Sequence, residues 1–129
     1  MRRIEGFIGG KSVKATSGRE GDVFNPNTGE VQAKVGLATE ADVDAAVQAA
    51  AKALPGWAGT NPQRRARVMF EFKRLVEANM QQLAELLSSE HGKVVADSKG
   101  DIQRGLEVIE FACGIPHALK GEYTEGAGP

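Results

Sequence analysis

Polar and apolar positions alternate along the first part of the chain, as they do in β-strands. Phe7–Val13 has Gly9-Gly10 at its centre, which supplies the positive φ angles of a two-residue turn and predicts a short hairpin. Residues 14–21 are polar and predict a loop, and Asn25–Gly29 is a strong turn signal. The following strand is predicted from the alternating apolar positions Val31, Ala33, Val35 and Leu37.

The apolar spacing changes after Thr39 to steps of three and four, which are typical of amphipathic helices. Thr39 is a good N-cap, and the first helix is expected to stop at Pro55-Gly56. Asn61 followed by Pro62 predicts the start of a second helix, which should end at His91-Gly92. Its apolar stripe comprises Met69, Phe72, Val76, Met80, Leu83 and Leu87.

A third helix is expected from about Val94 to Ile115. Its apolar face comprises Val95, Ile102, Leu106, Ile109 and Cys113. Gly100 and Gly105 each weaken this helix by roughly 1 kcal/mol relative to alanine, which suggests a close approach by another element. The few strands lack partners for a sheet and the stripes need cover, so the pattern indicates one layer of a larger α/β structure.

Composition excludes several classes of protein. The 129 residues carry 16 basic and 17 acidic side chains and only 5% aromatics, which argues against a nucleic-acid partner. No apolar run approaches the roughly 20 residues of a membrane-spanning helix. A single cysteine allows no internal disulfide, and no signal peptide is apparent, so a cytoplasmic location is expected.

Two candidate motifs are better explained by structure than by chemistry. Gly10-Lys11-Ser12 resembles the end of a phosphate-binding loop, but Glu5 stands where that motif needs glycine, so a hairpin turn is favoured. Cys113 and His117 are one helical turn apart. Because Cys113 continues an apolar stripe, and two ligands fall short of a metal site, inert packing is favoured over catalysis or metal binding.

Five charged residues are also better explained by structure than by chemistry. Arg64, Arg65 and Arg67 are explained by a solvated face or by partners on another segment, and Glu90 and Lys93 by capping and surface pairing.

Arg104 lies opposite the apolar stripe of the third helix, between two glycines that leave its guanidinium accessible to a carboxylate or phosphate. A surface ion pair with Asp101 or Glu107 is the favoured interpretation on physical grounds alone.

The order of motifs resembles the start of an aldehyde dehydrogenase. The resemblance begins with Asn25–Glu30 before a strand, continues with Ala38–Val43 opening a helix and Trp57 before the next, and then includes Arg64–Arg67 and Ser89–Lys93. Asp101–Glu107 followed by Glu110–Pro116 is similar to the CoA-acylating methylmalonate-semialdehyde dehydrogenase subfamily.

The resemblance implies an α/β aldehyde dehydrogenase-like fold, of which this chain would be the amino-terminal portion, mainly helical. Residues 1–129 would belong to the cofactor-binding domain: 7–37 as β-hairpins, 39–120 as a helical layer and 121–129 as the start of the connection to the oligomerisation arm. The family's catalytic cysteine, general-base glutamate, asparagine and nucleotide-binding turn would lie downstream. No catalytic, cofactor-binding or metal-binding residue is therefore expected here, and the chain is expected to be inactive by itself.

The resemblance also implies that Arg104 holds the substrate's carboxylate. The complete enzyme would use NAD as cofactor and CoA as co-substrate to oxidise malonate or methylmalonate semialdehyde. Its partners would be the rest of the dehydrogenase chain and further copies in a homo-oligomer. Two alternatives are a free-standing helical interaction module and part of another aldehyde dehydrogenase subfamily.

Overall fold

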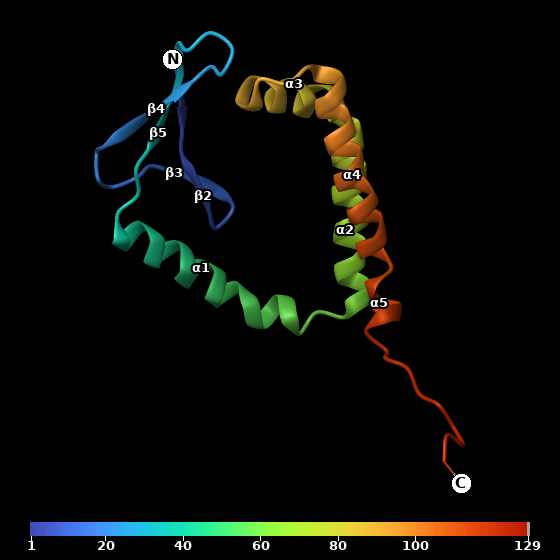
Figure 1. Cartoon of the computed structure of the whole chain (residues 1–129). Coiled ribbons are helices and arrows are strands. Elements are labelled where there is room, and N and C mark those ends of the chain that lie inside the picture. The colour runs from blue at the N-terminus through green and yellow to red at the C-terminus, as the bar shows by residue number, and fades with distance from the viewer. Residues whose placement is uncertain (129) are drawn as a thin grey trace. The chain divides into compact units, whose positions relative to one another are not determined.

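The computed structural model describes residues 1–128 and divides into two compact units. The first unit comprises residues 1–59 and 86–94, and the second comprises residues 60–85 and those from 95 onward. Figure 1 shows strands in the amino-terminal part of the chain and helices in the remainder. Pro129, the last residue of the predicted arm connection, lies outside the described residues.

The first unit contains a three-stranded sheet in the order β1-β5-β4. β5 (Val31–Gly36) is central, with β1 (Arg2–Ile4) parallel to it and β4 (Glu20–Phe24) antiparallel. Ala33 of β5 is buried. The expectation that these strands lack partners for a sheet is therefore wrong. β1 has only three residues, too few to show the alternation that identifies a strand in a sequence.

The predicted glycine hairpin is confirmed. β2 (Gly6–Ile8) and β3 (Lys11–Val13) pair in antiparallel fashion, and Gly9 and Gly10 adopt φ angles of 60° and 82°. Gly10-Lys11-Ser12 thus belongs to a hairpin and not to a phosphate-binding loop. The predicted loop over 14–21 ends earlier than expected, because β4 begins at Glu20.

α1 (Glu40–Ala58) begins at the predicted N-cap, Thr39. The Thr39 hydroxyl accepts from the backbone N–H of Asp42 at 3.2 Å, and the Asp42 carboxylate accepts from that of Thr39 at 2.8 Å. The predicted stop at Pro55-Gly56 is wrong, since the helix continues to Ala58 with Gly59 as C-cap. Pro55 lacks a backbone N–H, but its carbonyl accepts from the N–H of Gly59 at 3.0 Å, so the helical hydrogen-bond pattern continues past it.

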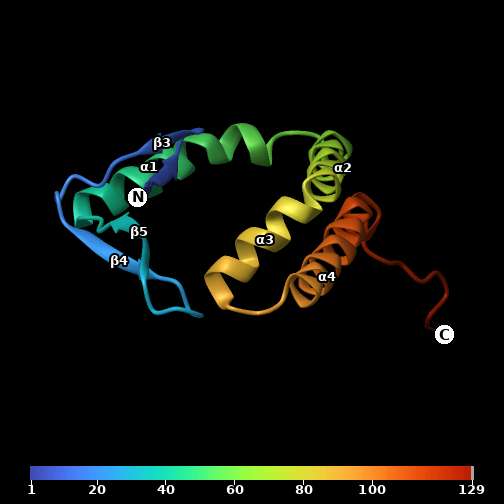
Figure 2. The ribbon, with the colours of Figure 1, turned by 90° about the horizontal axis from the view of Figure 1, so that it is seen from above.

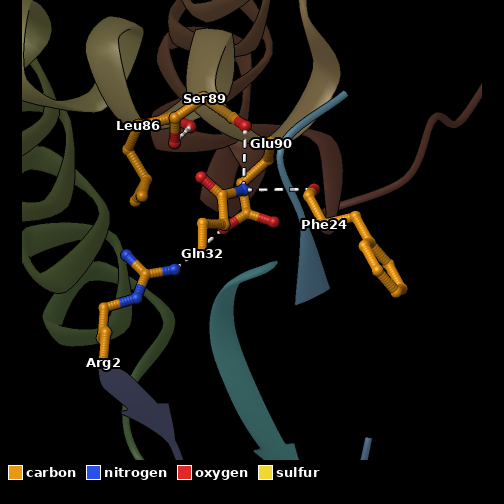
Figure 3. A network of polar contacts seen from close by, with 6 residues as sticks. All are labelled: Arg2, Phe24, Gln32, Leu86, Ser89 and Glu90. Atoms are coloured by element: carbon orange, nitrogen blue, oxygen red, sulfur yellow. Dashed lines mark hydrogen bonds and ion pairs between the residues drawn. The ribbon is translucent and has the colours of Figure 1, made fainter. Parts of the chain in front are cut away.

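The end of α3 (Met80–His91) contacts the sheet of the first unit (Figure 3). The side-chain amide of Gln32, on β5, donates to the carbonyls of Phe24 (3.3 Å) and Ser89 (3.1 Å). Arg2 of β1 pairs with Glu90 at 2.9 Å. Surface pairing of Glu90 is thereby confirmed. Gly92, at φ 88°, ends the helix as predicted.

The helix expected from Pro62 to His91 is two helices, α2 (Pro62–Ala78) and α3, separated at Asn79. Asn79 leaves the helical conformation at φ −110° and ψ 15°, and its side-chain amide donates to the Leu75 carbonyl at 2.7 Å. Asparagine competes in this way for helical carbonyls, so an apolar stripe that continues across it does not guarantee one helix.

The second unit is built on α2 and α4 (Val95–Cys113), which lie side by side (Figures 1 and 2). Leu106 and Cys113 of the predicted apolar face are buried, and Val95, Ile102 and Ile109 are half-buried, so that face is confirmed. The chain then passes Gly114 into the short α5 (Ile115–Ala118) instead of continuing the third helix to Ile115.

Every helix formed by residues 1–128 is too short or too polar to cross a lipid bilayer.

Candidate functional site

The outer face of α4 carries Arg104. Burial of Leu106 and Cys113 against the rest of the second unit fixes which side of the helix turns inward. Arg104 therefore points outward, and its side chain is 76% exposed. The predicted position opposite the apolar stripe is confirmed.

Arg104 forms an ion pair on its own helix. Its Nη1 donates to Oδ1 of Asp101, three residues earlier, at 2.7 Å. This is one of the two surface partners expected from the sequence. Among the described residues no hydrogen bond from Nε or Nη2 of Arg104 is present. Such an exposed pair contributes at most about 1 kcal/mol to stability, so Arg104 has little structural role.

Two glycines leave the surroundings of Arg104 open. A Cβ atom placed on Gly100 or on Gly105 would meet no heavy atom within 4 Å in residues 1–128. An open guanidinium edge with two parallel N–H donors matches the geometry of a carboxylate. The arrangement is suited to recognising a small carboxylate in two-point contact.

Cys113 and His117 line a cavity of about 490 Å³ in the second unit, together with Arg67 and Glu110. Cys113 is buried as part of the apolar face of α4, in agreement with its expected packing role. The presence of Arg67 in this lining was not predicted, because Arg67 comes from α2 and its place depends on how two helices pack. Within residues 1–128 no three potential metal ligands from His, Cys, Asp and Glu gather together.

The basic cluster at the start of α2 divides between two environments. Arg64 and Arg67 are exposed, as a solvated face requires. Arg65 is half-buried, and its Nε is buried without a hydrogen bond among the described residues, so the solvated-face interpretation is wrong for this residue. The next residue, Ala66, is buried as well.

Residues 13–128 match the model of the aldehyde dehydrogenase family, and the chain belongs to this family. It is 44% identical over its whole length to malonate-semialdehyde dehydrogenase of Pseudomonas aeruginosa, covering 26% of that protein. It is also 40% identical, over 90% of its length, to the human mitochondrial methylmalonate-semialdehyde/malonate-semialdehyde dehydrogenase, covering 22% of that protein. The chain thus spans about a quarter of the length of these relatives.

Two similar proteins with solved structures are also described as semialdehyde dehydrogenases. A protein from Sinorhizobium meliloti 1021, assigned as a methylmalonate-semialdehyde dehydrogenase and complexed with NAD, is 60% identical with a TM-score of 0.91. Methylmalonate-semialdehyde dehydrogenase from Oceanimonas doudoroffii is 43% identical with a TM-score of 0.91. All of this chain and 26% of each of those chains is covered. The mainly helical chain therefore has the fold of the amino-terminal part of aldehyde dehydrogenases.

Proposed function

We propose that this chain provides the amino-terminal part of an NAD-dependent, CoA-acylating dehydrogenase of malonate or methylmalonate semialdehyde. The similarity to semialdehyde dehydrogenases along the whole chain supports the substrate class. In the complete homo-oligomeric enzyme a thiolate would attack the aldehyde, NAD would accept hydride, and CoA would take the acyl group as carbon dioxide leaves.

No contact with NAD or CoA is assigned to this chain. In the Rossmann fold the pyrophosphate of a dinucleotide lies at a glycine-rich turn between a strand and the helix that follows it. In residues 1–128 the only direct strand-to-helix connection is Leu37-Ala38-Thr39, between β5 and α1, and it lacks that pattern.

The chain's own contribution to catalysis in this proposal is Arg104. The observation that carries this assignment is the Nε–Nη2 edge of its guanidinium, which is open. A planar pair of donors would orient the carboxylate of the semialdehyde, whereas an aldehyde without a carboxylate would gain nothing from it.

We predict that the 129-residue chain by itself does not oxidise aldehydes. Its single cysteine is Cys113, which is buried in the packing face of α4 and has no role in the proposed reaction. Purified chain with malonate semialdehyde, NAD and CoA should form no NADH at 340 nm. Turnover that disappears in Cys113→Ala would contradict the proposal.

We predict that Arg104→Lys selectively impairs the carboxylate-bearing substrate. The test uses a chimera in which this chain replaces the matching amino-terminal quarter of the Sinorhizobium meliloti relative. An ammonium group cannot reproduce a two-point contact, and loss of such a charge-assisted pair costs about 2–5 kcal/mol in transition-state binding. Specificity constants are measured for malonate semialdehyde and for propanal, and the ratio of the two should fall.

Arg74→Lys is the matched control, because Arg74 is an exposed arginine of α2 whose Nε and Nη2 both already bind Glu71. It should leave the ratio unchanged. If Arg104→Lys leaves the ratio unchanged as well, Arg104 is only a surface charge and the substrate assignment is wrong.

A further inference from the structure

Two arginines of the second unit pair with a carboxylate three residues earlier on the same helix, but the two pairs differ in geometry. In α2, Arg74 donates from Nε at 2.9 Å and from Nη2 at 2.6 Å to the two oxygens of Glu71. In α4, Arg104 donates only from Nη1, to Asp101. Glu71 thus occupies the side-on edge of its arginine, and Asp101 leaves that edge open.

The two acidic side chains differ in length. Both arginines are exposed, 62% and 76%, and both acids stand at the same spacing. Aspartate is one methylene shorter than glutamate, so on a helix its carboxylate stays nearer the backbone. Asp101 can therefore hold one nitrogen of the guanidinium, but it does not reach the Nε–Nη2 edge as Glu71 does.

We propose that Asp101 is a positioning residue for recognition of the substrate's carboxylate. Asp101 restrains the guanidinium of Arg104 through Nη1 and leaves the Nε–Nη2 edge for a short aliphatic aldehyde that bears a carboxylate. This inference rests on the proposed function of Arg104. A glutamate at position 101 would fill the same edge from within the chain and compete with the substrate.

The glycines on either side support this assignment. Gly100 lies one turn before Arg104 and Gly105 follows it, and glycine destabilises a helix interior relative to alanine. No described neighbour requires either glycine, because an added Cβ would meet open space at both positions. They leave room for a ligand to approach the open edge of the guanidinium.

The first test uses the 129-residue chain and follows the arginine Nε–H signals by NMR. In Asp101→Glu the Arg104 Nε–H should exchange more slowly with water and move toward the chemical shift of the Arg74 Nε–H. Asp97→Glu is the matched control, since it adds the same methylene to α4 two turns before Arg104. An unchanged Arg104 signal in Asp101→Glu would overturn the inference.

The second test uses the chimera and the same pair of substrates. In Asp101→Glu the specificity ratio of malonate semialdehyde to propanal should fall about two- to fivefold, the range expected from competition by an exposed ion pair. The loss should appear in KM for the semialdehyde, with kcat and propanal oxidation unchanged, and Asp97→Glu should behave as the parent.

Arg104→Lys, measured in parallel, separates the two proposals. If Arg104→Lys lowers the ratio but Asp101→Glu does not, the role of Asp101 is wrong and the proposed function stands. If neither variant changes the ratio, the proposed function fails and the inference fails with it.

Discussion

At the scale of single residues, Asp42 shows how a cap can also join two segments. Its carboxylate accepts hydrogen bonds from the backbone N–H groups of Thr39 at 2.8 Å and of Thr16 at 3.0 Å. These two bonds, that from Thr39 first, lower the pKa of Asp42 from 3.8 to about 2. The loop before β4 is thereby attached to the start of α1 through a charged group.

We predict a pH dependence of stability from this carboxylate. Because its pKa is lower in the folded state than in the unfolded state, its contribution is complete above about pH 4 and is lost as the pH falls through 2. Asp42→Asn mimics the protonated form. Urea unfolding of the chain should show the variant less stable than the parent at pH 5, with the difference closing near pH 2.

Asp44→Asn provides the control, because Asp44 is an exposed carboxylate of the same helix. It should not reproduce the effect. A difference between parent and Asp42→Asn that stays constant from pH 5 to pH 2 would show that the charge on Asp42 does not stabilise this junction.

At the scale of elements, helix starts were predictable and helix ends were less so. Thr39 and Asn61 cap α1 and α2 as expected, since capping is a local hydrogen bond between a side chain and the next few N–H groups. A helix end was predicted at Pro55 where the helix continues, and none was predicted at Asn79, where a helix ends. The Pro55 carbonyl still accepts a bond from Gly59, so the helix continues past the proline. The side-chain amide of Asn79, by contrast, binds the Leu75 carbonyl at the point where one helix ends within a continuous apolar stripe.

At the scale of the whole molecule, most of the large apolar side chains in the chain are uncovered. The sequence pattern predicted that the apolar surface left exposed in a monomer would comprise Met69, Phe72, Leu83, Leu106 and Ile109. Leu106 is buried between helices and only Phe72 of that set is exposed. The exposed apolar residues of α2 and α4 are instead Val68, Phe70, Phe72, Leu75, Val108 and Phe111.

We predict that the chain self-associates in solution. Monomers rarely leave more than a few hundred Å² of contiguous apolar surface exposed, and Val108 and Phe111 stand on one face of α4, 68% and 77% exposed. Multi-angle light scattering should report a mass above that of a 13.7 kDa monomer, and Phe111→Ser should shift the distribution toward monomer.

Tyr123→Ser is the comparison for that variant, because Tyr123 is also a highly exposed aromatic residue but lies outside the helices. It should leave the association unchanged. A monodisperse monomeric parent that binds no dye for apolar surfaces would contradict the prediction.

The sequence by itself determined the local features of this protein: the glycine hairpin, the helix caps, the buried face of α4 and the outward position of Arg104. Each depends on residues a few positions apart, and their spacing can be seen directly in the sequence. Tertiary structure alone decided the parallel pairing of β1 with β5 and the presence of Arg67 and Cys113 in the lining of one pocket, since both join segments distant in sequence. It also decided which nitrogen of Arg104 meets Asp101. Residue spacing brings that pair into reach, but only atomic geometry shows which edge of the guanidinium stays open.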